Sequence, residues 1–240
     1  MKSVFVETGN VTAFRRAVLT VEDTERGQPG IVVAWGQAGR GKTFTARNSY
    51  TERGGVFLSA WEGMSQAAFL SKLCFEVTGD QKCPRSAHAC KIRIVETLEK
   101  RRKQGGAVTI YMDEADRLAF GRVEDLRDIH EATGAAVILI GEEELIGLLS
   151  QRRRVWSRVT QEVPFGPVDE ADIAAFALEA ASLDLTPEAC AMVRTTSDGD
   201  MRLVRNMVQL LEQAAKARET NRADAAMVKA IQKQRSWRRA

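Results

Sequence analysis

Short hydrophobic runs recur along the first two thirds of the chain. They cover residues 31–35, 55–60, 108–112 and 137–141, and a weaker run lies at 159–165. Uninterrupted runs of this length, without a polar residue at every second position, are typical of strands that are buried on both faces of a parallel sheet. The pattern therefore predicts a parallel sheet at the centre of the fold.

Hydrophobic residues at spacings of three and four lie between these runs and predict amphipathic helices. The clearest pattern places Phe69, Leu70, Leu73 and Val77 on one helix face. Helices are predicted at residues 12–24, 42–52, 66–78 and 87–103, the last of them ended by Gly105-Gly106. Strands that alternate with helices indicate an α/β fold, with a doubly wound parallel sheet and helices on both faces.

The hydrophobic pattern changes near Pro167, and no strand is predicted beyond that residue. Helices are expected at residues 169–182, 186–196, 200–218 and 223–237. Pro187 in a first helical turn, and Asp198 or Asp200 as an N-cap, mark two of these helix starts. The chain is therefore expected to consist of a polar lead-in at residues 1–30, an α/β domain at 31–166 and a small all-helical domain at 167–240.

Composition narrows the class of protein. The 240 residues are 44% hydrophobic and 28% charged, which suffices for a sizeable core. No apolar run reaches membrane-spanning length, and the N-terminus lacks the apolar segment of a signal peptide, so we expect a cytoplasmic protein with no membrane partner. The four cysteines lack metal-site spacing and are expected to be reduced thiols. The net charge of +3 confines any nucleic-acid surface to a local patch.

The residues after the first predicted strand match G-x-x-x-x-G-K-[ST], the pattern of a phosphate-binding loop. Glycines let successive backbone N–H groups point into one anion-sized concavity, and the helix that follows adds the positive end of its dipole. Lys42 is expected to reach the β- and γ-phosphates, and the Thr43 hydroxyl to hold Mg²⁺. The expected nucleotide contacts in this stretch are Gly36, Gln37, Ala38, Gly39, Arg40, Gly41, Lys42, Thr43 and Phe44.

The third predicted strand is followed by two carboxylates, Asp113 and Glu114. A carboxylate at the end of a strand beside a phosphate loop can hold Mg²⁺ through water, which is the role expected for Asp113. Glu114 is placed to polarise the attacking water as a general base. The sequence therefore predicts an ATPase that converts ATP to ADP and phosphate with Mg²⁺, and the absence of an Asn-Lys-x-Asp motif favours ATP over GTP.

Phosphoryl transfer also needs cationic groups near the γ-phosphate. Two groups of arginines are candidates: Arg158 with the preceding run at 152–154, and Arg202 at the start of a helix in the small domain. Their spacing alone does not distinguish arginines that contact the γ-phosphate from ordinary surface arginines.

The order of these motifs resembles that of an AAA+ ATPase with a helical lid. The segments that carry the likeness are the phosphate loop, Ile-Tyr-Met-Asp-Glu at 110–114, Leu-Ile-Gly at 139–141, Ser-Arg-Val at 157–159 and Gly-Asp-Met-Arg at 199–202. More narrowly, the chain looks like the transposition ATPases related to the phage Mu B protein. The resemblance implies that Arg158 is an arginine finger acting on the neighbouring subunit's nucleotide and that Arg202 is the sensor 2 residue.

Two departures from the family pattern affect these expectations. Glu142 stands where sensor 1 usually has Asn, Thr or Ser, and an ionised glutamate cannot donate a hydrogen bond to the γ-phosphate, so slow or altered hydrolysis is expected. The Mu B protein also carries an N-terminal helix-turn-helix region, whereas this sequence starts almost directly at the ATPase core. DNA contacts are therefore expected from the ATPase domain itself.

The resemblance implies an ATP-dependent protein that assembles head to tail, as a ring or a helical filament, on duplex DNA. It would deliver target DNA to a cognate transposase and stimulate that enzyme, in a bacterial cytoplasm if the protein is phage-encoded. In related ATPases the DNA-facing surface comes from loops that correspond here to residues 61–66 and 81–91, with little base specificity. The expected DNA contacts are Trp61, Ser65, Lys82, Arg85 and Lys91. The basic tail at 232–240 is expected to contact DNA or a partner protein, or to be a solvated end.

Two other functions remain open from the sequence. One is a loader of helicases or replication initiators, from the same clade of ATPases. The other is a solitary P-loop kinase or a nucleotide-regulated binding module, in which Arg158 would have no role in a neighbouring site.

Overall fold

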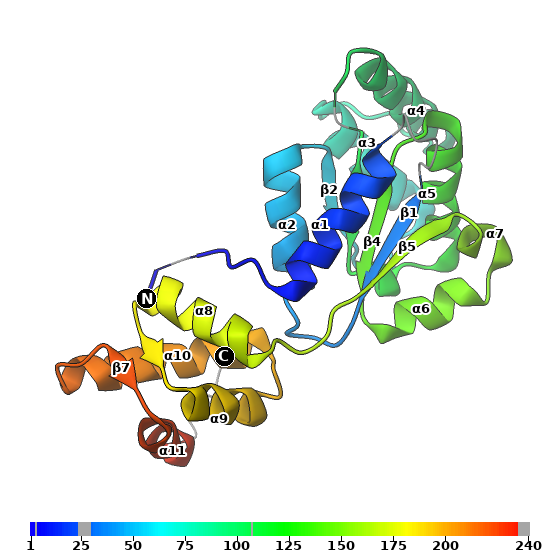
Figure 1. The fold of residues 1–240 in the computed structure, drawn as a ribbon. Helices are drawn as coiled ribbons and strands as arrows, with labels where there is room; N and C mark the ends of the chain where they lie inside the picture. The colour runs from blue at the N-terminus through cyan, green and yellow to red at the C-terminus, as the bar shows by residue number, and fades with distance from the viewer. Residues whose placement is uncertain (3, 24–29, 107, 235–240) are drawn as a thin grey trace. The chain divides into compact units, whose positions relative to one another are not determined.

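The computed structural model describes residues 1–2, 4–23, 30–106 and 108–234. The chain forms two compact units, which are described separately below (Figure 1). The α/β unit comprises residues 13–36 and 42–164. The helical unit comprises residues 1–12, 37–41 and those from 165 onward. Most of the basic tail, residues 235–240, lies outside the described residues.

A five-stranded parallel sheet forms the centre of the α/β unit and confirms the predicted fold class. Its strands are β1 (Ile31–Trp35), β2 (Val56–Ser59), β3 (Ile110–Asp113), β4 (Val137–Gly141) and β5 (Val159–Pro164), in the order β2-β3-β4-β1-β5. In the register of the sheet, Trp35 lies opposite Gly141 and Pro164, and Ser59 lies opposite Asp113. The carboxyl ends of all strands therefore meet at one edge, where the phosphate loop leaves β1.

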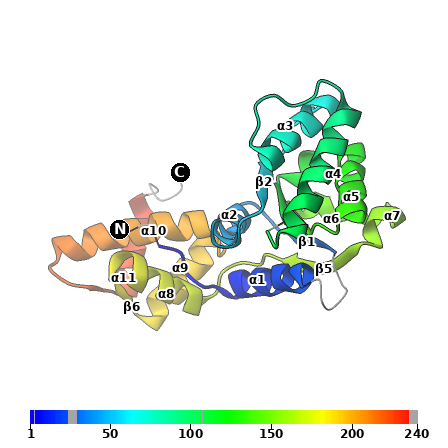
Figure 2. The same cartoon turned by 90° about the horizontal axis from the view of Figure 1, so that it is seen from above.

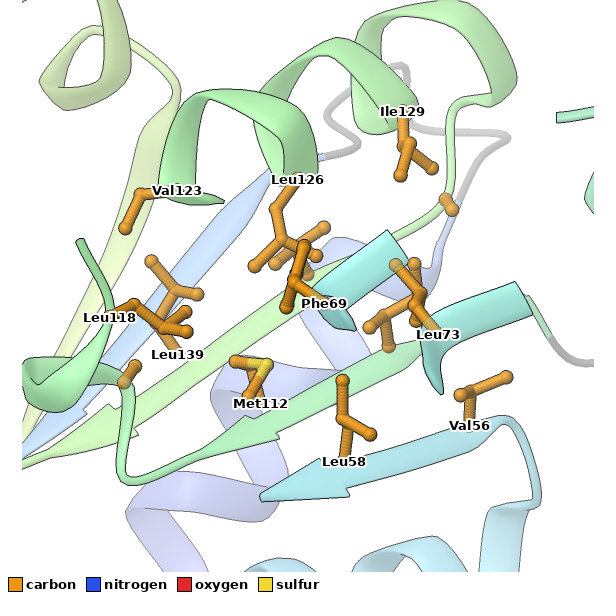
Figure 3. Packing of buried hydrophobic residues seen from close by; sticks show 14 of the residues in the cluster. Val56, Leu58, Phe69, Leu73, Met112, Leu118, Val123, Leu126, Ile129 and Leu139 are labelled. Atoms are coloured by element: carbon orange, nitrogen blue, oxygen red, sulfur yellow. The ribbon is translucent and has the colours of Figure 1, made fainter. Parts of the chain in front are cut away.

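Helices cover both faces of this sheet. They are α1 (Gly9–Glu22), α2 (Lys42–Arg53), α3 (Gln66–Thr78), α4 (Ala87–Lys103), η1 (Ala115–Arg117), α5 (Phe120–Thr133), α6 (Glu143–Ser150) and α7 (Arg153–Trp156). Figures 1 and 2 show α1 and α2 on one face and α3, α4 and α5 on the other. Val33, Met112 and Leu139 belong to the hydrophobic core to which α3 and α5 also contribute. Figure 3 shows Met112 and Leu139 beneath the residues of these two helices.

Helix α5 was not predicted from the hydrophobic pattern. Its buried positions include Asp125 and His130 besides Val123, Leu126 and Ile129. Asp125 accepts hydrogen bonds from Gln66 and Arg122, and the His130 Nδ1 lies 2.7 Å from the Ala135 carbonyl oxygen. Polar residues that find partners in the interior thus interrupt the apolar face by which a helix is recognised in a sequence.

The helical unit contains α8 (Glu170–Ala181), β6 (Asp184–Leu185), α9 (Pro187–Ser197), α10 (Met201–Ala217), β7 (Arg222–Ala223) and α11 (Ala225–Gln234). The expectation that no strand follows Pro167 was wrong, because β6 and β7 form a short parallel pair. Two-residue strands carry too few side chains to produce a readable pattern.

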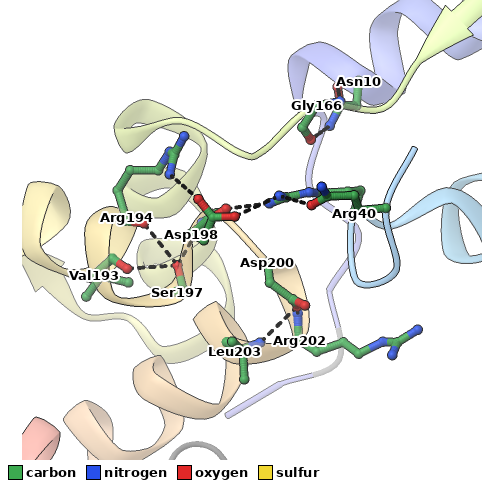
Figure 4. Close-up of polar contacts among 12 residues, drawn as sticks. Asn10, Arg40, Gly166, Val193, Arg194, Ser197, Asp198, Asp200, Arg202 and Leu203 are labelled. Atoms are coloured by element: carbon green, nitrogen blue, oxygen red, sulfur yellow. Dashed lines mark hydrogen bonds and ion pairs between the residues drawn. The ribbon is translucent and has the colours of Figure 1, made fainter. Parts of the chain in front are cut away.

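Residues 1–12, expected as a lead-in to the α/β domain, pack within the helical unit. Val6 joins its hydrophobic core, and the Lys2 N–H donates to the Ala180 carbonyl at 2.6 Å. Asn10 and Gly166 exchange two hydrogen bonds, at 2.9 and 3.2 Å (Figure 4).

All four cysteines are free thiols in this structure, and three of them are buried. Burial raises the pKa of Cys74 to about 12, which keeps it as the unreactive thiol. Within the residues that the structure describes, no helix combines the length and hydropathy that a bilayer crossing requires.

Candidate nucleotide site

The phosphate loop joins the end of β1 to the start of α2. Gly36, Gly39 and Gly41 all have positive φ angles, of 149°, 82° and 92°. At Gly41 an added Cβ would meet no neighbouring atom, so the glycine is required there by its backbone conformation alone. Helix α2 begins at Lys42, so its first free N–H groups face the end of the loop. The backbone therefore has the form expected of an anion cradle.

Lys42 is buried at the base of this loop. Its side chain donates a hydrogen bond to the Gly36 carbonyl at 2.5 Å. Burial lowers the pKa of the Lys42 ammonium from its ordinary value, and the carboxylates of Glu142, Asp116 and Glu114, with that of Asp113, oppose the decrease. The lysine thus lies among the carboxylates that end β3 and β4, where a cation can meet the negative charge of a phosphate.

Thr43 and Asp113 are brought together by the same geometry. The Thr43 hydroxyl donates to the Asp113 Oδ1 at 3.1 Å, and Asp113 is buried at the end of β3. A hydroxyl beside a carboxylate offers the hard oxygen ligands that Mg²⁺ prefers. Among the described residues, no group of three His, Cys, Asp or Glu side chains could hold a metal by itself. Thr43 and Asp113 are the residues that would hold Mg²⁺ beside the phosphate loop.

The pKa of Asp113 provides a test of this assignment. Burial raises the pKa of its carboxyl, and the hydrogen bond from Thr43 offsets part of the rise. Such a group stabilises the fold below its unfolded-state pKa, and that stability is lost as the pH rises through the folded-state pKa. At neutral pH, Asp113→Asn is therefore expected to raise the melting temperature by about 2 °C or more, while Mg²⁺-dependent nucleotide binding is lost. Thermal unfolding, and titration with a fluorescent ATP analogue with and without Mg²⁺, measure the two effects.

Asp128→Asn is the matched control for this variant. Burial acts to raise the pKa of Asp128, but hydrogen bonds from Lys91 and Arg127 outweigh it and lower the pKa. Stability linked to Asp128 is therefore present above its unfolded-state pKa, and its asparagine variant is expected to melt at a lower temperature with nucleotide binding unchanged. A lower melting temperature for both variants would contradict the interpretation of Asp113.

Glu114 adopts a conformation that is uncommon for a residue other than glycine. Its φ and ψ angles are 56° and 36°, in the left-handed region, directly after Asp113. Its carboxylate pairs with Arg117 at 2.9 Å, and both side chains are partly exposed. Backbone strain of this kind collects at functional sites, so the position suits a group that must be aimed at a substrate. Its role as general base stays a prediction.

Asp116 has a positioning role that the sequence did not reveal. Its Oδ1 accepts a hydrogen bond from the Glu142 N–H at 3.0 Å, and a Cβ at Gly141 would collide with the same carboxylate. Asp116 thereby fixes the end of β4 beside the end of β3. Glu142, expected at the sensor 1 position, is exposed at the start of α6 and makes no side-chain capping bond.

Arg158 lies between α7 and β5 and is 48% exposed. Its guanidinium pairs with Glu131 of α5 at 2.9 Å. Ion pairs between exposed side chains are worth about 0–1 kcal/mol, so Arg158 can exchange Glu131 for another anion at little cost. Arg152 of the same basic run stacks on the Phe120 ring at 4.7 Å.

Two candidate residues belong to the helical unit. Arg202 is the second residue of α10 and is exposed, and its N–H donates to the N-cap carboxylate of Asp200 at 2.7 Å (Figure 4). Arg40, in the phosphate loop, turns its guanidinium to Asp198. A nucleotide contact by Arg40 would therefore come from its backbone. Gln37 and Ala38 are exposed, and Phe44 in α2 is 56% exposed.

The expected DNA contacts have different environments. Trp61 is 65% exposed, and the Lys72 ammonium lies 4.3 Å from its ring centroid. The Ser65 hydroxyl caps α3 by accepting from the Ala68 N–H at 3.2 Å. Lys82 and Arg85 are exposed in the loop between α3 and α4.

Lys91, also expected to contact DNA, has two carboxylate partners within the chain. Its ammonium pairs with Asp125 at 3.3 Å and with Asp128 at 2.5 Å. The side chain of Asp125 is nearly buried, so Lys91 neutralises a carboxylate that needs a cation. In this structure Lys91 therefore holds α4 to α5, and its contact with DNA stays a prediction.

Comparison with known proteins places this site in context. Residues 25–149 match the model of a family described as AAA domain. Over 186 residues the chain is 24% identical to the Mu-like prophage FluMu DNA transposition protein B of Haemophilus influenzae. The match covers 72% of this chain and 62% of that protein, so the chain spans less than two thirds of the relative's length.

Solved structures share the fold. Cdc6p from Pyrobaculum aerophilum matches with a TM-score of 0.66 and 15% identity, over 92% of this chain and 66% of that one. The Holliday junction branch migration motor RuvB from Thermotoga maritima matches with a TM-score of 0.60 and 17% identity, over 93% of this chain and 68% of that one. At these identities the likeness shows the fold alone.

Proposed function

The chain belongs to the AAA domain family, and from that premise we propose that it is an ATPase that assembles on duplex DNA and presents this DNA to a transposase. The AAA+ likeness inferred from the sequence is confirmed by the family match, and the similarity to a transposition protein B agrees with the narrower likeness to Mu B-related proteins. We base the proposed role in transposition on this similarity to a DNA transposition protein. Such a role belongs to the cytoplasm, where ATP and duplex DNA are both available.

The observation that carries the proposed hydrolysis is the convergence of Lys42, Thr43 and Asp113. The Thr43–Asp113 pair would hold Mg²⁺, which supplies charge neutralisation to the phosphates when bound. Lys42 would bind the β- and γ-phosphates, and Glu114 would accept a proton from the attacking water. The loop N–H groups would hold the phosphates in line for that attack.

A site completed by a second copy supports the proposed assembly. Arg158 is exposed, and its guanidinium forms a surface ion pair with Glu131. Because such a pair is weak, Arg158 can leave Glu131 for the nucleotide of a neighbouring subunit. Because donor and acceptor surfaces differ, such a contact is head to tail and produces a ring or a helical filament. DNA contacts would come from Trp61, Lys82 and Arg85. The two cations would bind the phosphates of the DNA backbone, with a strong dependence on salt, and the Trp61 ring would offer a stacking surface.

Mixing two inactive variants tests the shared site. Lys42→Ala subunits would lack the phosphate contact but keep the finger, and Arg158→Ala subunits would have the reverse defect. The mixture is expected to regain DNA-stimulated ATPase activity well above the sum of its parts. The reason is that some interfaces combine the Lys42 of an Arg158→Ala subunit with the Arg158 of a Lys42→Ala subunit. Arg16→Ala, which removes an exposed arginine of α1, is the matched control and should behave as wild type.

Two results would contradict the proposal. One is a mixture that is no more active than its components, together with full activity of Arg158→Ala alone. The other is a protein that electron microscopy finds as single subunits on duplex DNA with a non-hydrolysable ATP analogue. A pulldown that recovers a replicative helicase and no transposase would favour the loader function, which the fold likeness to Cdc6p does not by itself support.

A further inference from the structure

We propose that Arg40 is a positioning residue that fastens the tip of the phosphate loop, residues 37–41, to the corner between α9 and α10. Through this contact the helical unit responds to the nucleotide state of the loop. The inference rests on the proposed nucleotide site and adds to it a route by which the lid senses occupancy.

The Arg40 guanidinium is enclosed by acceptors from this corner and from the loop itself. Its side chain is 7% exposed, although that of Asp198 is 82% exposed. The guanidinium donates to the Asp198 carbonyl oxygen, to the Asp198 carboxylate at 3.0 Å and to the Gln37 side-chain oxygen at 2.8 Å (Figure 4). A planar guanidinium that donates to a carbonyl and a carboxylate of one residue holds that residue in a single orientation.

The corner itself is a defined structure. Asp198 ends α9 in the left-handed conformation, with a φ of 51°, and its N–H donates to the Arg194 carbonyl. The Ser197 hydroxyl donates to the Val193 carbonyl at 2.8 Å and accepts from the Gly199 N–H at 3.2 Å. Arg40 therefore binds a corner whose shape is fixed by its own hydrogen bonds.

A second contact joins the loop to the same corner through the backbone. The Gly39 carbonyl accepts a hydrogen bond from the Met201 N–H at 3.0 Å. A Cβ at Gly39 would collide with the Asp200 carboxylate, which caps α10. Gly39 occupies a variable position of the phosphate-loop motif, so its glycine is explained by this close approach and by its positive φ angle.

These contacts connect the loop tip to the helix that carries the proposed sensor. Arg202 follows Met201, whose N–H binds the loop, at the start of α10. A nucleotide that orders the loop from its phosphate side would therefore bias the corner on its other side. Such coupling requires that the loop–corner contacts differ between the nucleotide-bound and nucleotide-free states, which is a measurable property.

Hydrogen exchange of the α10 amides, with and without a non-hydrolysable ATP analogue, tests the inference. In the wild-type chain the analogue is expected to protect the amides of residues 201–203. In Arg40→Ala this nucleotide-dependent protection is expected to disappear and kcat to fall by about tenfold, while the affinity for the analogue changes by less than about threefold. Arg40→Lys, which keeps one cation, is expected to restore part of both effects.

Two further variants separate this role from misfolding. Asp198→Asn removes the carboxylate that accepts from Arg40 but keeps the backbone carbonyl, and asparagine tolerates the left-handed conformation. This variant leaves the loop sequence unchanged and should reproduce part of the Arg40→Ala defect. Arg194→Ala removes the other cation near Asp198, at 4.0 Å, and is expected to behave as wild type. Asp198→Asn should add nothing in the Arg40→Ala background.

The outcomes distinguish the two proposals. A wild-type chain that binds no ATP analogue would overturn the proposed function. A wild-type chain that binds and hydrolyses ATP, with full α10 protection retained in both Arg40→Ala and Asp198→Asn, would overturn the role of Arg40 alone.

Discussion

A Lys42→Ala variant is expected to hydrolyse ATP about 100- to 1,000-fold more slowly than the wild-type chain. Lys42 is the cation at the base of the phosphate loop, and removing one preorganised charge that binds a developing negative charge typically costs that much in kcat. Phosphate release measured at saturating DNA gives the rate, and titration with a fluorescent ATP analogue gives the accompanying loss of affinity.

The stability of this variant separates a lost contact from a lost fold. Burial lowers the pKa of the Lys42 ammonium, which means that the charged form is held there at a cost in folding free energy. Lys42→Ala is therefore expected to melt no lower than wild type. Lys100→Ala, in the exposed last turn of α4, is the control and should keep full activity. Rapid hydrolysis by Lys42→Ala would remove the phosphate loop from the mechanism.

The second large effect is expected for Glu114→Gln. Loss of a general base typically slows a reaction by about 10²- to 10⁴-fold, and the amide keeps the size of the carboxylate. ATP binding should persist, because the loop, Lys42 and the Thr43–Asp113 pair are intact. The variant is therefore expected to remain bound to DNA as an ATP-loaded oligomer, which sedimentation with duplex DNA and a filter assay for retained nucleotide can measure.

Glu99→Gln, which neutralises an exposed glutamate on α4, is the matched control. Its turnover should equal that of wild type. The base role would be excluded if Glu114→Gln released phosphate at the wild-type rate, and a hydrolysis defect accompanied by lost nucleotide affinity would indicate a structural effect at the Glu114–Arg117 pair instead.

Local signals explain the elements that the sequence predicted well. Helices α3 and α4 begin and end where expected. Ser65 and Ser86 cap their first turns, and the buried residues within each helix recur at helical spacing. Strands β1 and β4 were likewise predicted within their observed bounds, because both are buried on both faces. The phosphate-loop motif and the strand that ends in Asp113 also assigned Thr43 and Asp113 to one Mg²⁺, and the structure places the two side chains within hydrogen-bonding distance. Binding of Mg²⁺ by this pair stays a prediction.

What the sequence did not reveal depends on contacts between distant residues. Arg40 and Asp198 are separated by 158 positions, and no local pattern indicates that a loop residue will bind the end of α9. Asp116 and Glu142 meet only because β3 and β4 are neighbours in the sheet. The same reason applies to Lys91, whose two carboxylate partners lie on a helix that the hydrophobic pattern missed.

The way the backbone alternates between the two units has a practical consequence for dissecting this protein. Residues 1–12 and 37–41 pack with the C-terminal helices, so neither unit corresponds to one continuous stretch of sequence. Deleting the first dozen residues would remove Val6 from the hydrophobic core that the C-terminal helices form. A fragment ending near Pro164 would leave the loop tip without its partners. Truncation experiments would thus report damage to both units at once, and single substitutions are the sounder way to separate their contributions.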